Sequence, residues 1–321
     1  IAPQYPGFSL GELVLPSEDG SELYLFQSSG RHIRTLSALT GATLLEFGYN
    51  SNGLLVSVTD ADGNLTTLER DAEGRLTGFL TPYGQRTTVT LDDQGYLASL
   101  TNPAAETVLI NSTPLGLINT FTDARGMTSS YTYDEMGRLV QIADQNGALQ
   151  TLVRTQLPAT TTSRGGYQVM LTSALGRKTI YKLERLRTRE TLMTVTFPNG
   201  LSNVASEFRN GITKLLLTDG TLIEQVSAPD PRWGMLAPFT QAMTLTLPSS
   251  LDYLVTTSRE ALLSDPADPS SMQTLTETTS INGLVYSLVY AAASQTFTAT
   301  TPEGRNRVMV MDAQGRPLSE Q

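Results

Sequence analysis

The chain of 321 residues is 39% hydrophobic and only 17% charged, which excludes an intrinsically disordered protein and allows a sizeable core. Its formal net charge is -9 and it has no Lys/Arg run, so we expect no nucleic-acid partner and no attraction to an anionic membrane surface. The absence of cysteine excludes disulfides and thiolate metal sites, and no apolar run approaches the roughly 20 residues of a membrane helix, so we expect no membrane insertion.

Residues 1–47 are predicted to form lead-in strands. They contain His32, the only histidine, which stands between Arg31 and Arg34. A Ser-His-Asp triad would therefore have a single candidate base, and the G-x-S-x-G nucleophile motif is missing. We expect His32 to have a structural role.

Glycines recur at a fixed period between about residues 48 and 155. One set is spaced by 21 residues, a second set keeps the same period with Ala105 in its vacant place, and the two sets interleave at 10 and 11 residues. An Asp, Asn or Thr stands three residues before each glycine, which is the chemistry of a tight turn that ends in a positive-φ residue. The predicted turn glycines are Gly53, Gly74, Gly95, Gly116 and Gly137 in the first set and Gly63, Gly84, Gly126 and Gly147 in the second set.

The segments between these glycines have six to eight residues and are rich in Thr, Leu, Val, Ile and Tyr, as strands are. Each 21-residue unit is therefore predicted to be a β-hairpin. An apolar residue stands five places after every turn glycine, and another stands two places after each glycine of the first set, such as Leu76 and Phe79 after Gly74. The odd offset between these two columns predicts a bulge, a sharp twist or burial on both faces.

A lone hairpin is marginal in water, so the units must stack on their neighbours to bury the apolar columns. The expected fold class is all-β, with tandem 21-residue hairpins stacked into a curved sheet. Similar turn sequences recur at Gly176, Gly200, Gly220, Gly304 and Gly315. Residues 156–321 are therefore predicted to be degenerate repeats with Pro-rich insertions.

Two stretches interrupt the array, Gln156–Gly166 and Ala228–Pro238. Three prolines in the second stretch exclude regular sheet and predict a loop or a local plug. This stretch holds the only tryptophan, Trp233, beside Arg232. Trp233 is a candidate ligand contact, because an aromatic face can stack on a sugar, and it is alternatively an anchor for the insertion.

The sequence Asp60-Ala-Asp62-Gly-Asn64 resembles half of a calcium loop, whose ligands are clustered carboxylate and carbonyl oxygens. The glutamate that would complete an EF-hand is missing, since position 71 is Asp. An Asx turn explains Asp60, Asp62 and Asn64 without a metal. We therefore expect no metal and no other cofactor.

Two motifs resemble a known repeat. They are Tyr133-Asp-Glu-Met-Gly-Arg-Leu139 and its echo Arg70-Asp-Ala-Glu-Gly-Arg-Leu76. They are similar to the YD repeat of the Rhs family, which includes bacterial Rhs polymorphic toxins, Tc-toxin cocoon subunits and teneurins. The resemblance is strong over residues 19–155 and weaker over 171–224 and 281–319. It implies a strip of hairpins that coils into a shell-like spiral, which in the toxins encloses a C-terminal effector domain.

One family feature is missing. The Rhs toxins close their shell with a segment that contains an Asp-Pro-x-Gly-Leu-like signature and the aspartates that cleave off the effector domain. This sequence has no such segment. The chain ends inside a repeat, at Arg316-Pro-Leu-Ser-Glu-Gln321. We therefore expect a single repeat-built domain over 1–321 that is a fragment of a longer protein, without an autoprotease or cargo.

The function expected from these features is that of a non-enzymatic shell segment. It would encapsulate or present another polypeptide, such as a toxin or effector domain, in a bacterial secreted or cell-surface protein. The alternative is an extracellular adhesion or carbohydrate-binding module with a cell-surface protein or glycan as partner. A cryptic hydrolase is the third choice, because any two strand-borne carboxylates can meet in the fold.

Overall fold

The computed structural model describes residues 12–320, which form 27 strands and no helix. This confirms the all-β prediction. The chain divides into two compact units: unit 1 contains residues 12–48, 58–64 and 209–320, and unit 2 contains residues 49–57 and 65–208. Residues 1–11 of the predicted lead-in, and Gln321, lie outside the described residues.

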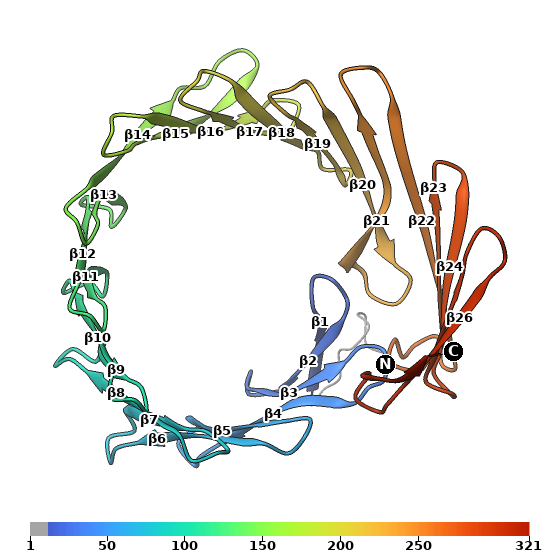
Figure 1. Ribbon diagram of the computed structural model, residues 1–321, viewed down its shortest axis with the longest axis horizontal. Helices are drawn as coiled ribbons and strands as arrows, with labels where there is room; N and C mark the ends of the chain where they lie inside the picture. The colour runs from blue at the N-terminus through green and yellow to red at the C-terminus, as the bar shows by residue number, and fades with distance from the viewer. Residues whose placement is uncertain (1–11, 321) are drawn as a thin grey trace. The chain divides into compact units, whose positions relative to one another are not determined.

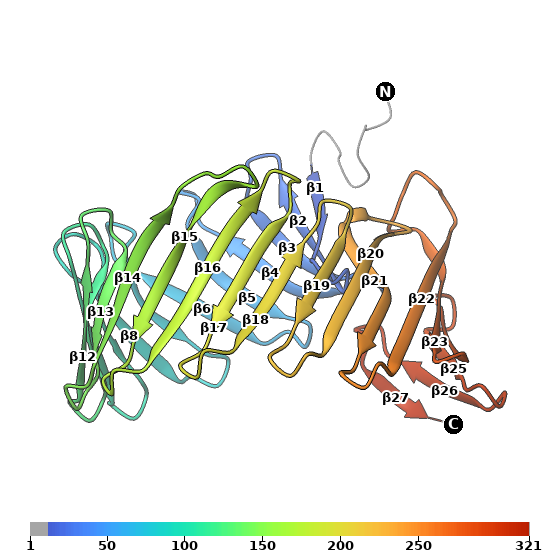
Figure 2. The ribbon, with the colours of Figure 1, turned by 90° about the horizontal axis from the view of Figure 1, so that it is seen from above.

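Unit 2 is an antiparallel meander in which each strand pairs with its neighbours in the chain. Its strands follow one another along a curved strip (Figure 1), with turns along both edges (Figure 2). They are β6 (Leu65–Arg70), β7 (Leu76–Leu80), β8 (Arg86–Leu91), β9 (Leu97–Thr101), β10 (Thr107–Ser112), β11 (Ile118–Thr122), β12 (Thr128–Tyr133), β13 (Leu139–Ala143), β14 (Leu149–Leu157), β15 (Ser163–Thr172), β16 (Lys178–Leu186), β17 (Thr191–Thr196) and β18 (Ser202–Glu207).

Unit 1 contains two further antiparallel meanders, one from each end of the chain. The first comprises β1 (Glu12–Pro16), β2 (Glu22–Gln27), β3 (His32–Ser37) and β4 (Thr43–Tyr49). The second comprises β19 (Ile212–Leu216), β20 (Leu222–Asp230), β21 (Gly234–Thr246), β22 (Asp252–Leu263), β23 (Met272–Ile281), β24 (Leu284–Ala291), β25 (Thr296–Thr300), β26 (Asn306–Met311) and β27 (Pro317–Glu320). The remaining strand, β5 (Leu55–Asp60), has residues in both units, and Tyr49 at the end of β4 belongs to unit 2.

The hairpin turns share one hydrogen-bond pattern, which Asp71 illustrates. Its carbonyl accepts the amide N–H of Gly74 at 3.0 Å, and its own N–H donates to the carbonyl of Arg75 at 3.0 Å. Its carboxylate Oδ1 accepts the amide N–H groups of Glu73 and Arg75. All nine predicted turn glycines have positive φ, between 74° and 87°, and Ala105 has a φ of 63°. These features describe a type I turn closed by a residue in the left-handed region.

Bulges lie beside the first set of turns. Leu76 pairs with Arg70 whereas Gly78 pairs with Glu69, so Thr77 is an extra residue in the strand. The same shift recurs between Thr90/Leu91, Asn111/Ser112 and Thr132/Tyr133. These bulges confirm one of the explanations predicted for the odd offset between the apolar columns, and a bulge bends its strand and increases the local twist.

The register places the apolar columns of unit 2 on one face of the strip. Cross-strand pairs on that face are Leu68–Phe79, Val89–Leu100, Ile110–Phe121 and Tyr131–Ile142. Hydroxyl pairs lie on the other face, where Thr101 bonds Thr107 and Thr122 bonds Thr128, both at 2.8 Å. Successive side chains of a strand point to opposite faces of the sheet. In unit 2 one face is therefore apolar and the other carries hydroxyl groups.

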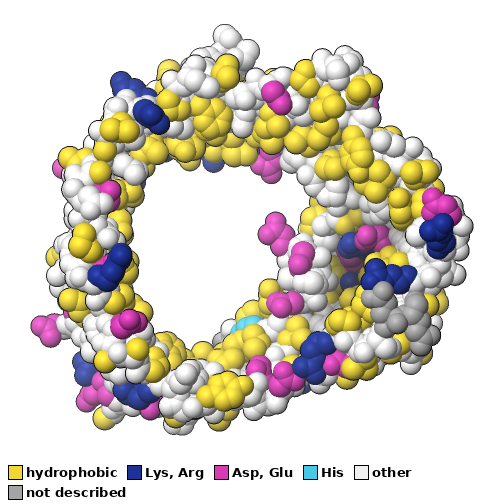
Figure 3. Space-filling view, in the orientation of Figure 1, with side chains coloured by type: hydrophobic (Ala, Val, Ile, Leu, Met, Phe, Trp, Pro, Cys, Tyr) yellow, Lys and Arg dark blue, Asp and Glu magenta, His cyan; other side chains and the backbone are white. Residues whose placement is uncertain are grey.

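Few side chains are fully buried, because each strip is a single layer. The accessible surface is 19686 Å², whereas a compact monomer of 34.7 kDa exposes about 13,000 Å². Many large apolar side chains stay partly exposed, and Figure 3 shows hydrophobic side chains along the wall that β14–β18 form. The fold thus leaves apolar surface that its own chain does not cover.

The prediction that the prolines of 228–238 exclude sheet was wrong. Strand β20 runs through Pro229 and β21 runs through Pro238, and only residues 231–233 lie between the two strands. Ala228 pairs with Phe239 and Asp230 pairs with Gly234, with a register shift between Ala228 and Asp230. Pro229 lies at that irregularity, where a residue without an N–H group costs no ladder hydrogen bond.

Two matched glycine substitutions separate the cost of the backbone conformation from the cost of crowding. A Cβ on Gly126 (φ +82°) would meet nothing within 4 Å, whereas a Cβ on Gly116 (φ +80°) would lie 2.7 Å from Cε1 of Tyr96. We expect Gly126→Ala to lower the free energy of unfolding by about 1 kcal/mol and Gly116→Ala by about 2–3 kcal/mol. Urea unfolding measures both, and equal losses would contradict the crowding by Tyr96.

Candidate functional site

The residue that follows each glycine of the first set either packs against the next hairpin or binds the aspartate of its own turn. Leu54, Tyr96 and Leu117 are in this position, and their side chains lie against the turn glycine one repeat later, within 3.3 Å of where a Cβ would stand. Arg75 and Arg138 occupy the same position, but each forms an ion pair with the aspartate of its own turn. At this position an apolar residue therefore packs one hairpin against the next, whereas an arginine stabilises its own turn through an ion pair.

The Tyr of the YD motif contacts the preceding repeat. The hydroxyl of Tyr133 donates to the carbonyl of Ile118 at 2.7 Å. Arg70, which replaces this Tyr in an earlier repeat, donates from Nε and Nη2 to the carbonyl of Leu55 at 3.0 and 2.9 Å. Leu55 and Ile118 both stand two places after a first-set glycine, so an aromatic hydroxyl and a guanidinium bind the equivalent carbonyl. Sequence reasoning missed these contacts, although the shared position before the turn aspartate was the available signal.

The turns hold their aspartates in the charged form. Hydrogen bonds from Arg138 and its amide lower the pKa of Asp134, and the amide of Met127 and the Arg125 side chain lower the pKa of Asp123. The pKa of Asp19 falls to about 2, mainly because the Ser17 hydroxyl and Ser21 donate to it. Each of these shifts means that the folded turn binds a carboxylate better than a carboxylic acid.

Trp233 is in the core of unit 1. It is 4% exposed and forms a cluster with Leu23, Ala38 and Ala237. The short segment between β20 and β21 thereby packs against strands near the start of the chain. A sugar could reach the ring face of Trp233 only if this cluster opened.

The buried Asp230 and Arg232 contact this cluster, and two partly buried charged residues extend their network. The Asp230 carboxylate accepts the amide N–H groups of Arg232 and Trp233, and Nη1 of Arg259 donates to its other oxygen at 3.2 Å. Arg259 also donates from Nε and Nη2 to Glu277. Nη1 of Arg232 donates to the carbonyl of Ala38 at 2.8 Å, and burial lowers the pKa of Arg232. Asp230 thus holds the turn that carries Trp233, while Arg232 ties that turn to the segment after β3.

The calcium candidates are engaged in other contacts. Asp60 accepts the amides of Asp62 and Asn64 and the side-chain amide of Asn64. Asp62 forms an ion pair with Arg316 at 2.6 Å. Within residues 12–320 no cluster of three or more His, Asp or Glu side chains could hold a metal ion.

His32 lies among aromatic rings. Its ring centroid is 4.9 Å from that of Phe26 and 4.5 Å from that of Phe47. Its Nε2 atom is 2.8 Å from the carbonyl of Arg34. These contacts fix the imidazole as part of the packing of unit 1.

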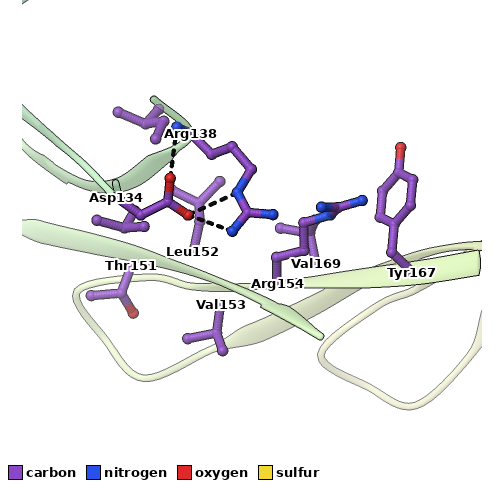
Figure 4. Close-up of a pocket in the computed structure, with 10 residues that line it drawn as sticks. Asp134, Arg138, Thr151, Leu152, Val153, Arg154, Tyr167 and Val169 are labelled. Carbon is purple, nitrogen blue, oxygen red and sulfur yellow. Dashed lines mark hydrogen bonds and ion pairs between the residues drawn. The ribbon is translucent and has the colours of Figure 1, made fainter. Parts of the chain in front are cut away.

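Unit 2 has a groove of ≈ 770 Å³ where β13, β14 and β15 meet (Figure 4), which we call the Arg154 groove. Its lining includes Asp134, Arg138, Leu152, Arg154, Tyr167 and Val169. Arg138 forms an ion pair with Asp134 at 2.7 Å. The guanidinium of Arg154 lies over the ring of Tyr167, 4.2 Å from its centroid.

Comparisons with known proteins agree with the repeat motif. The family model described as Teneurin YD-shell matches residues 11–320. Teneurin-m of Drosophila melanogaster is 34% identical over 140 residues, which are 42% of this chain and 5% of that protein. Teneurin-4 of Mus musculus is 30% identical over 138 residues, which are 43% of this chain and 5% of that protein. The chain therefore spans only a small part of the length of these curated relatives.

One solved structure covers most of the chain at low identity. The crystal structure of TcdB2-TccC3-Cdc42 aligns with 97% of this chain and 21% of that chain, with 11% identity and a TM-score of 0.48.

Over residues 12–320 no helix is long and apolar enough to cross a membrane.

Acid should destabilise the protein through its turn aspartates. A carboxyl whose pKa is lowered by folding contributes stability that is present above its unfolded value of 3.8 and is lost as pH falls through the folded value. We expect the temperature of thermal unfolding to decrease as the pH is lowered below 4. Asp123→Asn should make this pH dependence weaker, because an asparagine already caps the equivalent turn at Asn102 and does not titrate. Glu135→Gln is the control, since the exposed Glu135 takes no part in the turn bonds. An unchanged acid dependence in Asp123→Asn would contradict this role.

The Tyr133 hydroxyl should contribute measurable stability. We expect Tyr133→Phe to lower the free energy of unfolding by about 1 kcal/mol, because it removes the bond to the Ile118 carbonyl and keeps the ring. Tyr83 is 82% exposed, so Tyr83→Phe should change nothing. Equal effects of the two substitutions in urea unfolding would show that the Tyr133 bond does not stabilise the stack.

Trp233 should anchor the β20–β21 turn. We expect Trp233→Ala to cost about 3–5 kcal/mol of unfolding free energy and to speed amide exchange in β2 and β3, where Leu23 and Leu36 lose their contact. Met235 belongs to the same hairpin and is 60% exposed, so Met235→Ala should cost less than about 0.5 kcal/mol. Unchanged exchange in β2 and β3 would refute the anchoring role.

Proposed function

Because the chain belongs to the teneurin YD-shell family, we propose that it is a non-enzymatic shell segment that encloses or presents another polypeptide. The observation that carries the proposal is the single-layer array of hairpins with an apolar face that its own chain leaves open. Its accessible surface of 19686 Å² is about one and a half times that of a compact monomer of this mass. Such an extended apolar surface is what we expect of a sheet that covers another polypeptide.

The geometry of the charged groups supports a structural role. The buried carboxylate of Asp230 is saturated by two amides and a guanidinium, and the turn aspartates are held by amides and arginines. His32 is bonded to backbone and packed between rings. These groups fix the fold instead of facing a substrate.

The motifs shared with Rhs toxins support a more specific proposal. We infer that the enclosed polypeptide is an effector or toxin domain, and that the parent protein is secreted by, or displayed on, a bacterial cell. An adhesion role on the cell surface is the competing proposal, because the matched relatives named above are teneurins. The two proposals differ in whether the partner is a segment of the same protein.

Limited proteolysis of the full-length natural protein that contains this chain tests the proposal. We expect one segment outside residues 1–321 to resist protease in the intact protein and to be cleaved rapidly when it is expressed alone. The Gly126→Ala variant, which weakens one turn, serves to show that protection depends on the repeats. If every flanking segment is cleaved at the same rate in the intact protein and alone, enclosure is refuted and the adhesion proposal takes its place.

A further inference from the structure

The Arg154 groove combines one uncompensated positive charge with an aliphatic floor. Arg138 is neutralised by Asp134, whose Oδ2 accepts from Nε and Nη2 of Arg138, both at 2.7 Å. Within residues 12–320, no carboxylate forms an ion pair with Arg154. The side chain of Arg154 is exposed.

Tyr167 holds Arg154 in place. Strand register pairs Arg154 with Val169 and Gln156 with Tyr167, so the Tyr167 ring lies diagonally across from Arg154 on the same face. Figure 4 shows Arg138, Arg154 and Tyr167 on one side of β14, and Thr151 and Val153 on the other. Stacking over the ring at 4.2 Å limits the rotamers of Arg154 and leaves the N–H groups at its edge free to donate.

The arrangement favours a carboxylate ligand attached to an aliphatic chain. A guanidinium donates two parallel hydrogen bonds to a carboxylate, and Leu152 and Val169 lie next to it on the same strand face. A sugar platform needs an open aromatic face, but Arg154 already covers one face of Tyr167. A groove of ≈ 770 Å³ has room for two or three amino-acid side chains.

We propose that the Arg154 groove binds an acidic side chain of a partner polypeptide, with Arg154 on the carboxylate and Leu152 and Val169 against a neighbouring aliphatic side chain. The proposal takes from the proposed function only the class of partner, a polypeptide. It adds a site and a chemistry: an acidic residue flanked by leucine or a similar residue. The groove lies on the face of the apolar columns, because Leu152 belongs to one of them, but enclosure of a domain does not require Arg154 to bind a carboxylate.

Fluorescence anisotropy with labelled peptides tests the proposal on the whole chain. The probes are a nonapeptide of alternating Leu and Glu within Gly-Ser ends, and the same peptide with Gln for Glu. We expect the Glu peptide to bind about tenfold more tightly than the Gln peptide, and Arg154→Gln to remove that difference. Arg125→Gln is the matched control, because Arg125 is exposed and pairs only within its own turn, so it should leave binding unchanged.

A second variant tests the stacking. Tyr167→Phe keeps the ring and should retain binding, whereas Tyr167→Ala should weaken it several-fold because Arg154 loses its platform. Equal binding of both peptides, or no binding of either, overturns the proposal. Binding of oligogalacturonate through Arg154 without binding of the Glu peptide also overturns it, since the ligand would then be an acidic sugar. None of these outcomes changes the expected protease protection of an enclosed domain.

Discussion

The unpaired backbone edge of each hairpin is the constraint on which the rest of this structure depends. A two-stranded hairpin leaves N–H and C=O groups open along both outer strands and has too little apolar contact to stay folded alone. In unit 2 every strand from β7 to β17 finds a partner on each side, so each hairpin is completed by the next. Stability in such an array comes mainly from neighbour contacts.

Contacts between repeats reinforce this backbone ladder at three levels. The apolar columns pair across strands, the residue after a turn glycine packs on the next turn, and the Tyr or Arg before a turn aspartate binds a carbonyl of the preceding repeat. None of these contacts adds a second layer. The sheet can therefore be complete as a fold and still present an apolar face to another polypeptide, which is the basis of the proposed function.

The local features of this fold were predictable from the sequence, and the long-range ones were not. The spacing of Gly74 and its counterparts, together with the aspartates before them, predicted the turns and the strands, and the offset between Leu76 and Phe79 predicted an irregularity that the structure shows as a bulge at Thr77. Trp233 was assigned to an insertion, but its partners Leu23 and Ala38 are about two hundred residues away, and no periodicity connects them. The prediction of a loop at Pro229 failed because the register irregularity between Ala228 and Asp230 leaves no ladder hydrogen bond there for proline to lose. The stacking of Arg154 on Tyr167 depends on the register across residues 158–162, where the repeat is interrupted.

Deletion of one repeat measures most directly whether the 21-residue unit governs the fold. Removing residues 78–98 joins Thr77 to Ser99 and keeps Leu100 five places after Gly74, in the apolar column. Removing residues 79–98 differs by one residue and shifts Leu100 to the opposite face. The account predicts that the first variant unfolds cooperatively in urea with a modest loss of stability and that the second loses most of its protected amides in unit 2. Equal stability of the two variants, or unfolding of the first, would contradict it.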